Sequence, residues 1–381
     1  MRDAHGSCHV PMGAIEDEIT RIEEEIRKTP YNKATQGHIG RLKAKIAVLR
    51  LEREKRAKSG GGGLGYAVRK SGHATVALVG YPSVGKSTLL THLTGAESQA
   101  AAYEFTTTTI IPGMLSWRGA AIQILDMPGL IPGASSGRGR GREVISVARN
   151  SDLILFLLDK DHLEFRSLLA ELEKAGIRIN QRPPRIVVTP RERGGVSVHS
   201  TVRLTKMDEE QAQGIAKEFR MHNGDIVLRE DASPDQLIDV LAGNRVYIPA
   251  ILGVNKADLI AQSERPPIST RLAPTRVLFV SAQKEQGFQE LKEAIADALA
   301  FIRIYVKPPG QPPDLAEPVI LRKGNTISDL LLRLPPDLTE GFRSALVWGK
   351  SAKFPGQTVG RDHPLADQDV VTVVVQRGTK T

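Results

Sequence analysis

The sequence of 381 residues lacks the features that mark secreted and membrane-spanning proteins. Its one cysteine, Cys8, excludes a disulfide within the chain. The longest apolar runs, such as 153–158, are strand-sized and far short of the roughly 20 residues that cross a bilayer. The first twenty positions carry acidic and polar residues and no apolar core of a secretory signal. We therefore expect a cytoplasmic protein that does not enter membranes.

Acidic residues are in the minority, because 43 Asp and Glu stand against 52 Lys and Arg, a net charge of +9. The excess is concentrated in 41–58, which contains only two acids, Glu52 and Glu54. Such a segment is typical of nucleic-acid binding, but exposed helices are often charged without any partner, so both interpretations stay open. The RNA-binding candidates are Arg41, Lys43, Lys45, Arg50, Arg53, Lys55, Arg56 and Lys58.

Hydrophobic spacing predicts how the chain is organised. Apolar residues recur every three or four positions in 15–26 and again in 39–49, which predicts a helical hairpin. Four glycines at 60–63 predict a flexible hinge after it. Short apolar strands then alternate with helices, which is typical of a doubly wound α/β domain. These strands are expected at 75–79, 122–125, 153–158, 250–254 and 277–280.

Two further segments need structures of their own. About 90 residues separate the strands that end at 158 and begin at 250, too many for a loop, so we expect an inserted small α/β domain. Five prolines in 307–318 predict a stiff linker, and the strand, helix, strand, strand pattern beyond it suits a small β-grasp module. The predicted domain limits are 1–60, 61–174, 175–247, 248–303 and 304–381.

A phosphate-binding motif follows the first predicted strand. Residues 80–87 read GYPSVGKS and match GxxxxGK[ST] between a strand and a helix, which is the context that the motif requires. In such a loop backbone amides surround the phosphates, the lysine reaches the β and γ oxygens, and the serine hydroxyl is offered to Mg²⁺. The residues expected to bind nucleotide are Gly80, Tyr81, Pro82, Ser83, Val84, Gly85, Lys86, Ser87 and Thr88.

A DxxG motif, residues 126–129, ends the next strand. Asp126 is placed to hold Mg²⁺ together with Ser87, and the Gly129 amide to meet the γ-phosphate. Between the two motifs, Phe105 is followed by four threonines at 106–109, one of which could complete the magnesium shell when the γ-phosphate is present. The sequence therefore predicts a nucleotide triphosphate bound with Mg²⁺.

The base is predicted from residues 255–258, which read NKAD after the strand 250–254. The carboxylate of Asp258 can accept both the N1–H and the N2–H₂ of guanine, and adenine offers no such pair of donors. Asn255 and Lys256 complete this loop, and Ser281-Ala282, after the next strand, is expected to direct a backbone amide at guanine O6. We therefore expect GTP and GDP as ligands.

The residues expected to catalyse hydrolysis are less complete than those expected to bind the nucleotide. Ras-like enzymes carry a water-orienting glutamine just after DxxG, where this chain has Leu130, so we expect slow hydrolysis. A monovalent cation, a partner, or Arg138, Arg140 and Arg142 could supply the missing stabilisation, although RNA binding or contact with solvent is the commoner role of arginines in such a segment. Two rivals stay open: a GTP-binding scaffold with negligible hydrolysis, and an ATPase of the Obg-like group.

Several further segments extend the likeness beyond the nucleotide motifs. They are NKAT at 32–35, YEFTT at 103–107, GRGRGR at 137–142, GNRVYIP at 243–249 and VWGKS at 347–351. On these residues nearly the whole chain resembles the developmentally regulated GTP-binding (DRG) proteins of the Obg-related GTPases. The resemblance implies a helix-turn-helix hairpin, a P-loop GTPase core interrupted by a ribosomal-protein-like α+β insert, and a C-terminal TGS domain of β-grasp fold.

The resemblance also implies roles and partners. Thr107, rather than Thr106, would be the switch threonine on Mg²⁺, acting with Lys86 and Gly129, and the aliphatic Leu130 is expected of the group. Turnover would be stimulated by K⁺ near the phosphate loop, although related potassium-dependent GTPases place an asparagine where this chain has Ser83. Such proteins resemble ribosome-associated translation factors that often bind a small partner protein. We expect a monomer.

Overall fold

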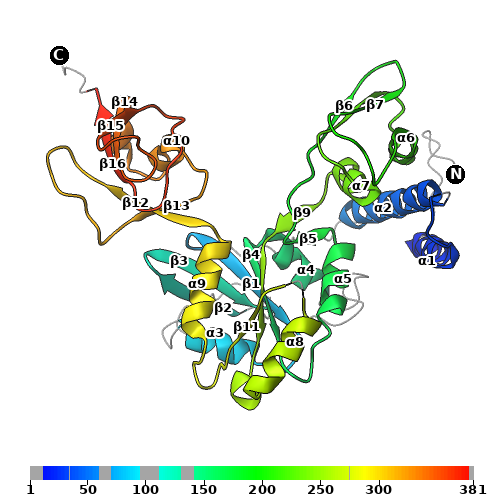
Figure 1. Cartoon of the computed structure of the whole chain (residues 1–381), viewed down its shortest axis with the longest axis horizontal. Helices are drawn as coiled ribbons and strands as arrows, with labels where there is room; N and C mark the ends of the chain where they lie inside the picture. Colours follow the sequence, from blue (N-terminus) through cyan, green and yellow to red (C-terminus); the bar gives the residue numbers. More distant parts are fainter. Residues whose placement is uncertain are drawn as a thin grey trace. The chain divides into compact units, whose positions relative to one another are not determined.

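The computed structural model describes residues 12–33, 35–59, 70–94, 111–129, 141–273 and 275–376, without the side chains of 12, 13, 57–59, 111 and 142. The chain separates into two compact units (Figure 1). The first unit joins 1–65 with 176–247, and the second joins 66–175 with 248–381. The predicted hinge at 60–63 lies outside the described residues.

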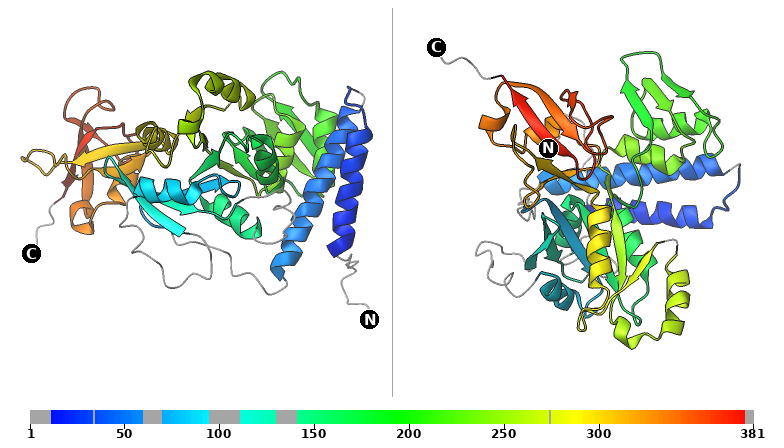
Figure 2. Two further views of the ribbon diagram at one scale, coloured as in Figure 1. Left: turned by 90° about the horizontal axis from the view of Figure 1, so that it is seen from below. Right: turned by 60° about the vertical axis from the view of Figure 1, so that its left-hand side comes forward.

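The first unit begins with an antiparallel hairpin of α1 (Met12–Lys28) and α2 (Gln36–Ser59), seen side by side in Figure 2. The isoleucines of α1 pack against Ile46 and Leu49 of α2. The turn is closed reciprocally: the Asn32 amide donates to Thr35 Oγ1 and the Thr35 amide donates to Asn32 Oδ1, both at 3.0 Å. Apolar spacing and a side-chain-bonded turn therefore account for the predicted hairpin.

The inserted segment forms a three-stranded sheet in the order β6-β8-β7, with a separate ribbon of β5 and β9. Ala44 and Ala47 of α2 are buried in the same core as the helices α6 and α7. The hairpin and the insert were expected as separate domains, but they share one unit because small residues on α2 allow close packing. The elements are β5 (Ile177–Ile179), β6 (Ile186–Pro190), β7 (Val196–Ser200), α6 (Glu209–Glu218), β8 (Gly224–Leu228), α7 (Pro234–Ala242) and β9 (Val246–Ile248).

The second unit is built on a six-stranded sheet in the order β11-β10-β4-β1-β3-β2, parallel except for β2. Helices α3 and α9 pack on one face, and on the other face Phe156 meets Phe165 of α5 with ring centroids 5.0 Å apart. The doubly wound α/β prediction is confirmed. The elements are β1 (Ala74–Gly80), α3 (Lys86–Thr94), β2 (Ile111–Trp117), β3 (Ala120–Asp126), α4 (Gly141–Asn150), β4 (Leu153–Leu158), α5 (Phe165–Lys174), β10 (Ala250–Val254), η3 (Ala257–Leu259), η4 (Gln262–Glu264), α8 (Arg265–Arg271), β11 (Val277–Phe279) and α9 (Phe288–Ala298).

The C-terminal part has its own five-stranded sheet, in the order β13-β12-β16-β14-β15, which confirms the β-grasp prediction. Its first strand starts at Phe301, before the predicted limit at 304, because β12 pairs with β13 and with the distant β16. The elements are β12 (Phe301–Val306), β13 (Val319–Arg322), α10 (Ile327–Leu331), α11 (Pro336–Thr339), β14 (Phe342–Trp348), β15 (Gln357–Val359) and β16 (Val370–Val375).

Candidate nucleotide-binding site

The phosphate loop joins β1 to α3 and approaches neighbouring backbone closely. A Cβ on Gly80 would collide with the Leu157 carbonyl oxygen, and one on Gly85 would collide with Asn255 Nδ2. Gly85 also has φ +91, in the region that favours glycine. Both motif glycines are therefore needed by the geometry of this loop.

Lys86 lies at the start of α3 with only 8% of its surface exposed. Its ammonium donates to the Tyr81 carbonyl at 2.8 Å and to the Gly80 carbonyl at 3.4 Å. Burial lowers the pKa of Lys86, and the nearby carboxylate of Asp126 acts in the opposite direction. The cation is thus held inside the loop, where a phosphate would find little competing water.

Ser87 and Asp126 meet beside this lysine. Ser87 Oγ donates to Asp126 Oδ2 at 2.5 Å, while Asp126 Oδ1 is buried without a hydrogen-bond partner among the described residues. Burial raises the pKa of Asp126, and the Ser87 hydrogen bond only partly offsets this. A buried carboxylate oxygen with no donor, next to a serine hydroxyl, suits the oxygen ligands that Mg²⁺ takes in nucleotide sites. These two residues therefore fit the expected metal.

Gly129, the last residue of the DxxG motif, lies against the phosphate loop. A Cβ at this position would lie 2.8 Å from Pro82 N and Cδ. Only glycine therefore allows residue 129 to come this close to the loop that carries Lys86.

Asn255 is buried and hydrogen-bonds to two other loops, the phosphate loop and the loop after β11. Its Nδ2 donates to the Val84 carbonyl and its Oδ1 accepts from the Ala282 amide, both at 2.9 Å. The Ser281 amide donates to the Gln286 carbonyl at 3.0 Å. The two residues expected to present an amide to guanine O6 therefore use their amides within the protein, because the loop after β11 folds back on itself and on Asn255.

Asp258 is the last residue of the 255–258 loop, and 11% of its side chain is exposed. A hydrogen bond from Ser281 lowers its pKa, and Lys284, whose Nζ lies 3.5 Å from Oδ2, acts in the same direction. Asp258 is therefore kept ionised, as an acceptor for the two donors of guanine must be.

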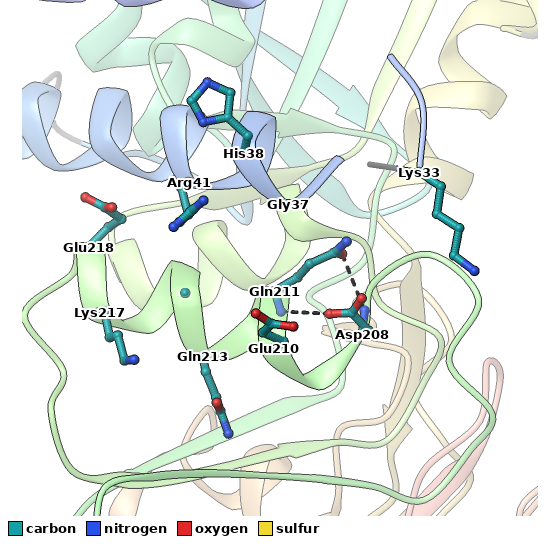
Figure 3. Close-up of a pocket in the computed structure, with 11 residues that line it drawn as sticks. Lys33, Gly37, His38, Arg41, Asp208, Glu210, Gln211, Gln213, Lys217 and Glu218 are labelled. Atoms are coloured by element: carbon teal, nitrogen blue, oxygen red, sulfur yellow. Dashed lines mark hydrogen bonds between the residues drawn. The ribbon is translucent and has the colours of Figure 1, made fainter. Parts of the chain in front are cut away.

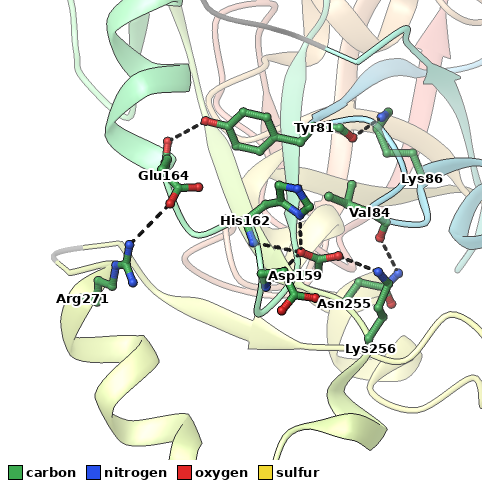
Figure 4. Close-up of polar contacts among 10 residues, drawn as sticks. Tyr81, Val84, Lys86, Asp159, His162, Glu164, Asn255, Lys256 and Arg271 are labelled. Carbon is green, nitrogen blue, oxygen red and sulfur yellow. Dashed lines mark hydrogen bonds and ion pairs between the residues drawn. The ribbon is translucent and has the colours of Figure 1, made fainter.

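Sequence reasoning missed Asp159, which follows β4 directly. Its carboxylate accepts from Lys256 Nζ at 2.6 Å and contacts His162 Nδ1 at 2.8 Å (Figure 4). Burial alone would raise the pKa of Asp159, but hydrogen bonds from Lys256 and His162 outweigh this effect and lower it. The available signal was the position, since β10 and β4 pair in parallel with Val254 opposite Leu158, which brings the residues after the two strands together.

Some predicted residues lie outside the described part of the chain. They are Phe105, Thr106, Thr107, Leu130, Arg138 and Arg140, and the side chain of Arg142 at the start of α4 is likewise not described.

Several cations of α2 are engaged in ion pairs. Their acidic partners come from α1 and from the insert, at 2.7 to 3.7 Å, and the pairs are Lys43–Asp235, Lys45–Glu18, Arg50–Glu23 and Arg53–Glu16. Lys55 is exposed, Arg56 is half-buried, and the side chain of Lys58 is not described. Arg41 lines a polar hollow of about 450 Å³ between α2 and α6, with Asp208 and Lys217 (Figure 3). Tertiary partners thus offset much of the positive charge that the sequence shows.

Comparison with known proteins agrees with this geometry. Residues 75–190 match the family model of the 50S ribosome-binding GTPase, residues 193–301 the C-terminal region of that domain, and residues 302–375 the TGS domain. The chain is 54% identical over 368 residues to an uncharacterized GTP-binding protein of Methanocaldococcus jannaschii, covering 95% of this chain and 93% of that protein.

Two relatives that carry the family name are almost as similar. The Arabidopsis thaliana developmentally-regulated G-protein 3 is 46% identical over 371 residues, covering 95% of this chain and 99% of that protein. The Homo sapiens developmentally-regulated GTP-binding protein 2 is 45% identical over 366 residues, covering 95% of this chain and 100% of that protein. The chain belongs to the DRG family of GTP-binding proteins. In the described part of the chain no helix combines the length and apolar character needed to cross a membrane.

Proposed function

We propose that this DRG-family protein binds GTP with Mg²⁺ in the pocket between the phosphate loop and the 255–258 loop and hydrolyses it slowly to GDP and phosphate. The contact between Ser87 and Asp126 supports this most directly, because it leaves one buried carboxylate oxygen without a donor beside the Lys86 ammonium. An oxygen acceptor and a cation side by side are what a metal-bound triphosphate requires.

Each residue of the proposed site has a separate role. Lys86 exchanges its carbonyl acceptors for phosphate oxygens, and its burial strengthens that attraction. Ser87, Asp126 and Thr107 hold Mg²⁺, which when bound offsets the charge that develops on the β and γ oxygens. Gly129 presents its amide to the γ-phosphate. Leu130 cannot orient the attacking water, so the chemical step is slow and K⁺ is expected to stimulate it.

Single-turnover hydrolysis tests this proposal. Pre-bound GTP should be converted to GDP slowly, faster with K⁺ than with Na⁺, and not at all after Mg²⁺ is chelated. Ser87→Ala should reduce the rate by about tenfold or more, because a metal ligand is lost. Ser151→Ala is the matched control, since its buried hydroxyl donates to the Val147 carbonyl at 2.9 Å. Equal rates for the two variants would contradict the assigned role of Ser87.

We further propose that the nucleotide switches contacts with the ribosome or structured RNA during translation, in the cytoplasm, as a monomer that binds a small partner protein. The match to a 50S ribosome-binding GTPase model and the TGS domain support this role. Co-sedimentation with ribosomes should be stronger with a non-hydrolysable GTP analogue than with GDP. The same binding to ribosomes in both nucleotide states would contradict a switch.

Residues of α2 without a structural ion pair are the better choice for testing RNA binding by charge reversal. Reversing the charge of Arg53 would break its contact with Glu16 and disturb the hairpin itself. Lys55 is exposed and Arg41 lines the hollow beside α6, so Arg41→Glu with Lys55→Glu is the sharper variant. It should weaken RNA affinity and flatten its salt dependence, because the slope grows with the number of phosphates that the protein neutralises. Unchanged affinity and slope would mean that 41–58 is a solvated helix.

Leu130 also supports a second candidate, a GTP-binding scaffold without meaningful hydrolysis. Single-turnover measurements with K⁺ and with ribosomes separate the two. No hydrolysis under any of these conditions would favour the scaffold.

A further inference from the structure

The segment 159–164 after β4 has no part in the function proposed so far, although it contacts both loops of the nucleotide pocket. Asp159 is only 1% exposed, and its Oδ1 accepts from the Asp161 amide at 3.2 Å and from the His162 amide at 3.0 Å. These two bonds close a tight turn on the carboxylate. Oδ2 is left for Lys256, at 2.6 Å.

The pairing of the strands explains how Asp159 reaches Lys256. Leu158 stands opposite Val254 in the parallel ladder, and the ladder continues past the strand because the Asn255 amide donates to the Leu158 carbonyl at 2.8 Å. Lys256 then adopts φ +59, a conformation that residues with side chains rarely take. The ion pair with Asp159 helps to hold this turn in the loop that is expected to bind guanine.

The other end of the segment 159–164 contacts the phosphate loop. Tyr81 Oη donates to the Glu164 carbonyl at 3.1 Å, and its ring lies 5.7 Å from the His162 ring. The Tyr81 carbonyl in turn accepts from Lys86 at 2.8 Å. Figure 4 shows the hydrogen bonds of Lys86 with Tyr81, of Tyr81 with Glu164, and of Asp159 with His162 and Lys256.

We propose that Asp159 is a positioning residue for guanine-nucleotide binding, which acts by holding Lys256 in place and by fixing the 159–164 turn against Tyr81. The inference rests on the nucleotide pocket proposed above. Asp159 itself need not touch the nucleotide. Its effect should fall on retention of the nucleotide, because Lys256 belongs to the base-recognition loop, and should spare the hydrolysis of GTP that is already bound.

A purely structural role is the simpler alternative, and the geometry gives a way to separate the two. A buried carboxylate needs compensation wherever it lies, so loss of Asp159 alone would destabilise many arrangements. Only a positioning role makes its effect depend on Lys256. That dependence is what a double-mutant cycle measures.

The experiment measures release of a fluorescent GDP analogue from the full-length chain by displacement with excess GDP. Asp159→Asn should release it about tenfold to a hundredfold faster, the range of a charge-assisted hydrogen bond. GDP and a GTP analogue should be affected alike, because they share the base. Asp152→Asn is the matched control: it lies before the same strand, pairs with Arg322 at 2.7 Å, and should leave release unchanged.

The cycle with Lys256→Gln decides the mechanism. On that background Asp159→Asn should accelerate release little further. The Asp159→Asn single variant should hydrolyse bound GTP in a single turnover at the rate of the unmutated chain. Full additivity, an equal effect of Asp152→Asn, or unchanged release in Asp159→Asn would each overturn the proposal. If Asp159→Asn does not fold, Lys256→Arg and Lys256→Gln replace it, with slow release expected only for the arginine. Failure of the unmutated chain to bind the analogue would instead refute the pocket itself.

Discussion

Replacing Gly85 by alanine should weaken nucleotide binding by about thirtyfold or more. The glycine has φ +91, and a Cβ there would collide with Asn255 Nδ2, the atom that donates to the Val84 carbonyl at 2.9 Å. The added methyl group would therefore strain the phosphate loop and separate it from the loop that binds the base. Both changes act on the nucleotide pocket and leave the rest of the sheet intact.

The magnitude follows from two contributions. A left-handed conformation costs an alanine about 1–2 kcal/mol. Breaking the buried Asn255 hydrogen bond, which leaves the Val84 carbonyl unsatisfied, costs about 1–3 kcal/mol. Together these give roughly 2–5 kcal/mol, or a loss of affinity from about thirtyfold to several thousandfold.

Titration with a fluorescent GDP analogue measures this loss, and Gly310→Ala is the control for alanine strain outside the phosphate loop. Gly310 lies in the linker before β13 with φ +78, and a Cβ added to it would have no other atom within 4 Å. It has the same conformational strain but lies outside the phosphate loop, so the affinity of this variant should equal that of the unmutated chain. An affinity of Gly85→Ala within about threefold of the unmutated value, less than about 1 kcal/mol, would refute the reasoning.

Two further changes test the base site and the pH response. Asp258→Asn should weaken GDP binding by about a hundredfold or more and favour xanthosine diphosphate, because the amide can donate to the C2 carbonyl of xanthine; competition titration measures this, and unaltered preference would contradict the role of Asp258. Asp367 pairs with Arg303 at 2.7 Å, and a hydrogen bond from Arg303 lowers the pKa of Asp367, so its stabilising effect is present above the ordinary aspartate pKa and lost as pH falls through the lowered value. Asp367→Asn should therefore cost at most about 1 kcal/mol at pH 7, since the pair is partly exposed, and nothing in strong acid; a difference in urea unfolding that persists in acid would contradict this.

Strands were predicted most accurately where the residues within the strand itself determine its position. The strands 153–158 and 250–254 were predicted with the bounds that the structure has, because each is a short apolar run and the second is followed by the NKAD motif. β2 was not predicted, since it contains Pro112 and Gly113, which are rare in strands. Its place at the sheet edge tolerates the proline, and at Gly113 a Cβ would collide with Leu90 of α3. β12 was placed partly in the core because one of its two partner strands, β16, lies far along the chain.

The residues of the site likewise divide into those that a local motif predicts and those that depend on distant parts of the chain. Lys86, Ser87 and Asp126 could be predicted because each stands at a fixed distance from a strand end in a known motif. Asp159 was missed, because its role depends on the register between β4 and β10, and in the sequence only its position directly after a predicted strand points to it. The charge of 41–58 was visible, but its neutralisation was not, since the acidic partners lie on α1 and on the insert.

The motif GNRVYIP at 243–249 shows how a family-specific segment can serve the fold rather than the chemistry. Gly243 ends α7 in the left-handed conformation, Asn244 Nδ2 donates to Glu54 of α2 at 3.1 Å, and Arg245 Nε donates to the buried Asp239 at 2.9 Å. Arg178 of β5 binds the same carboxylate through two nitrogens, each at 2.6 Å. Because β5 and β9 are also paired as a ribbon, the entry and exit of the insert are fixed side by side on α7. The insert lies between two neighbouring strands of the parallel sheet, β4 and β10, so its two ends must lie near each other, and the contacts of the motif hold them there.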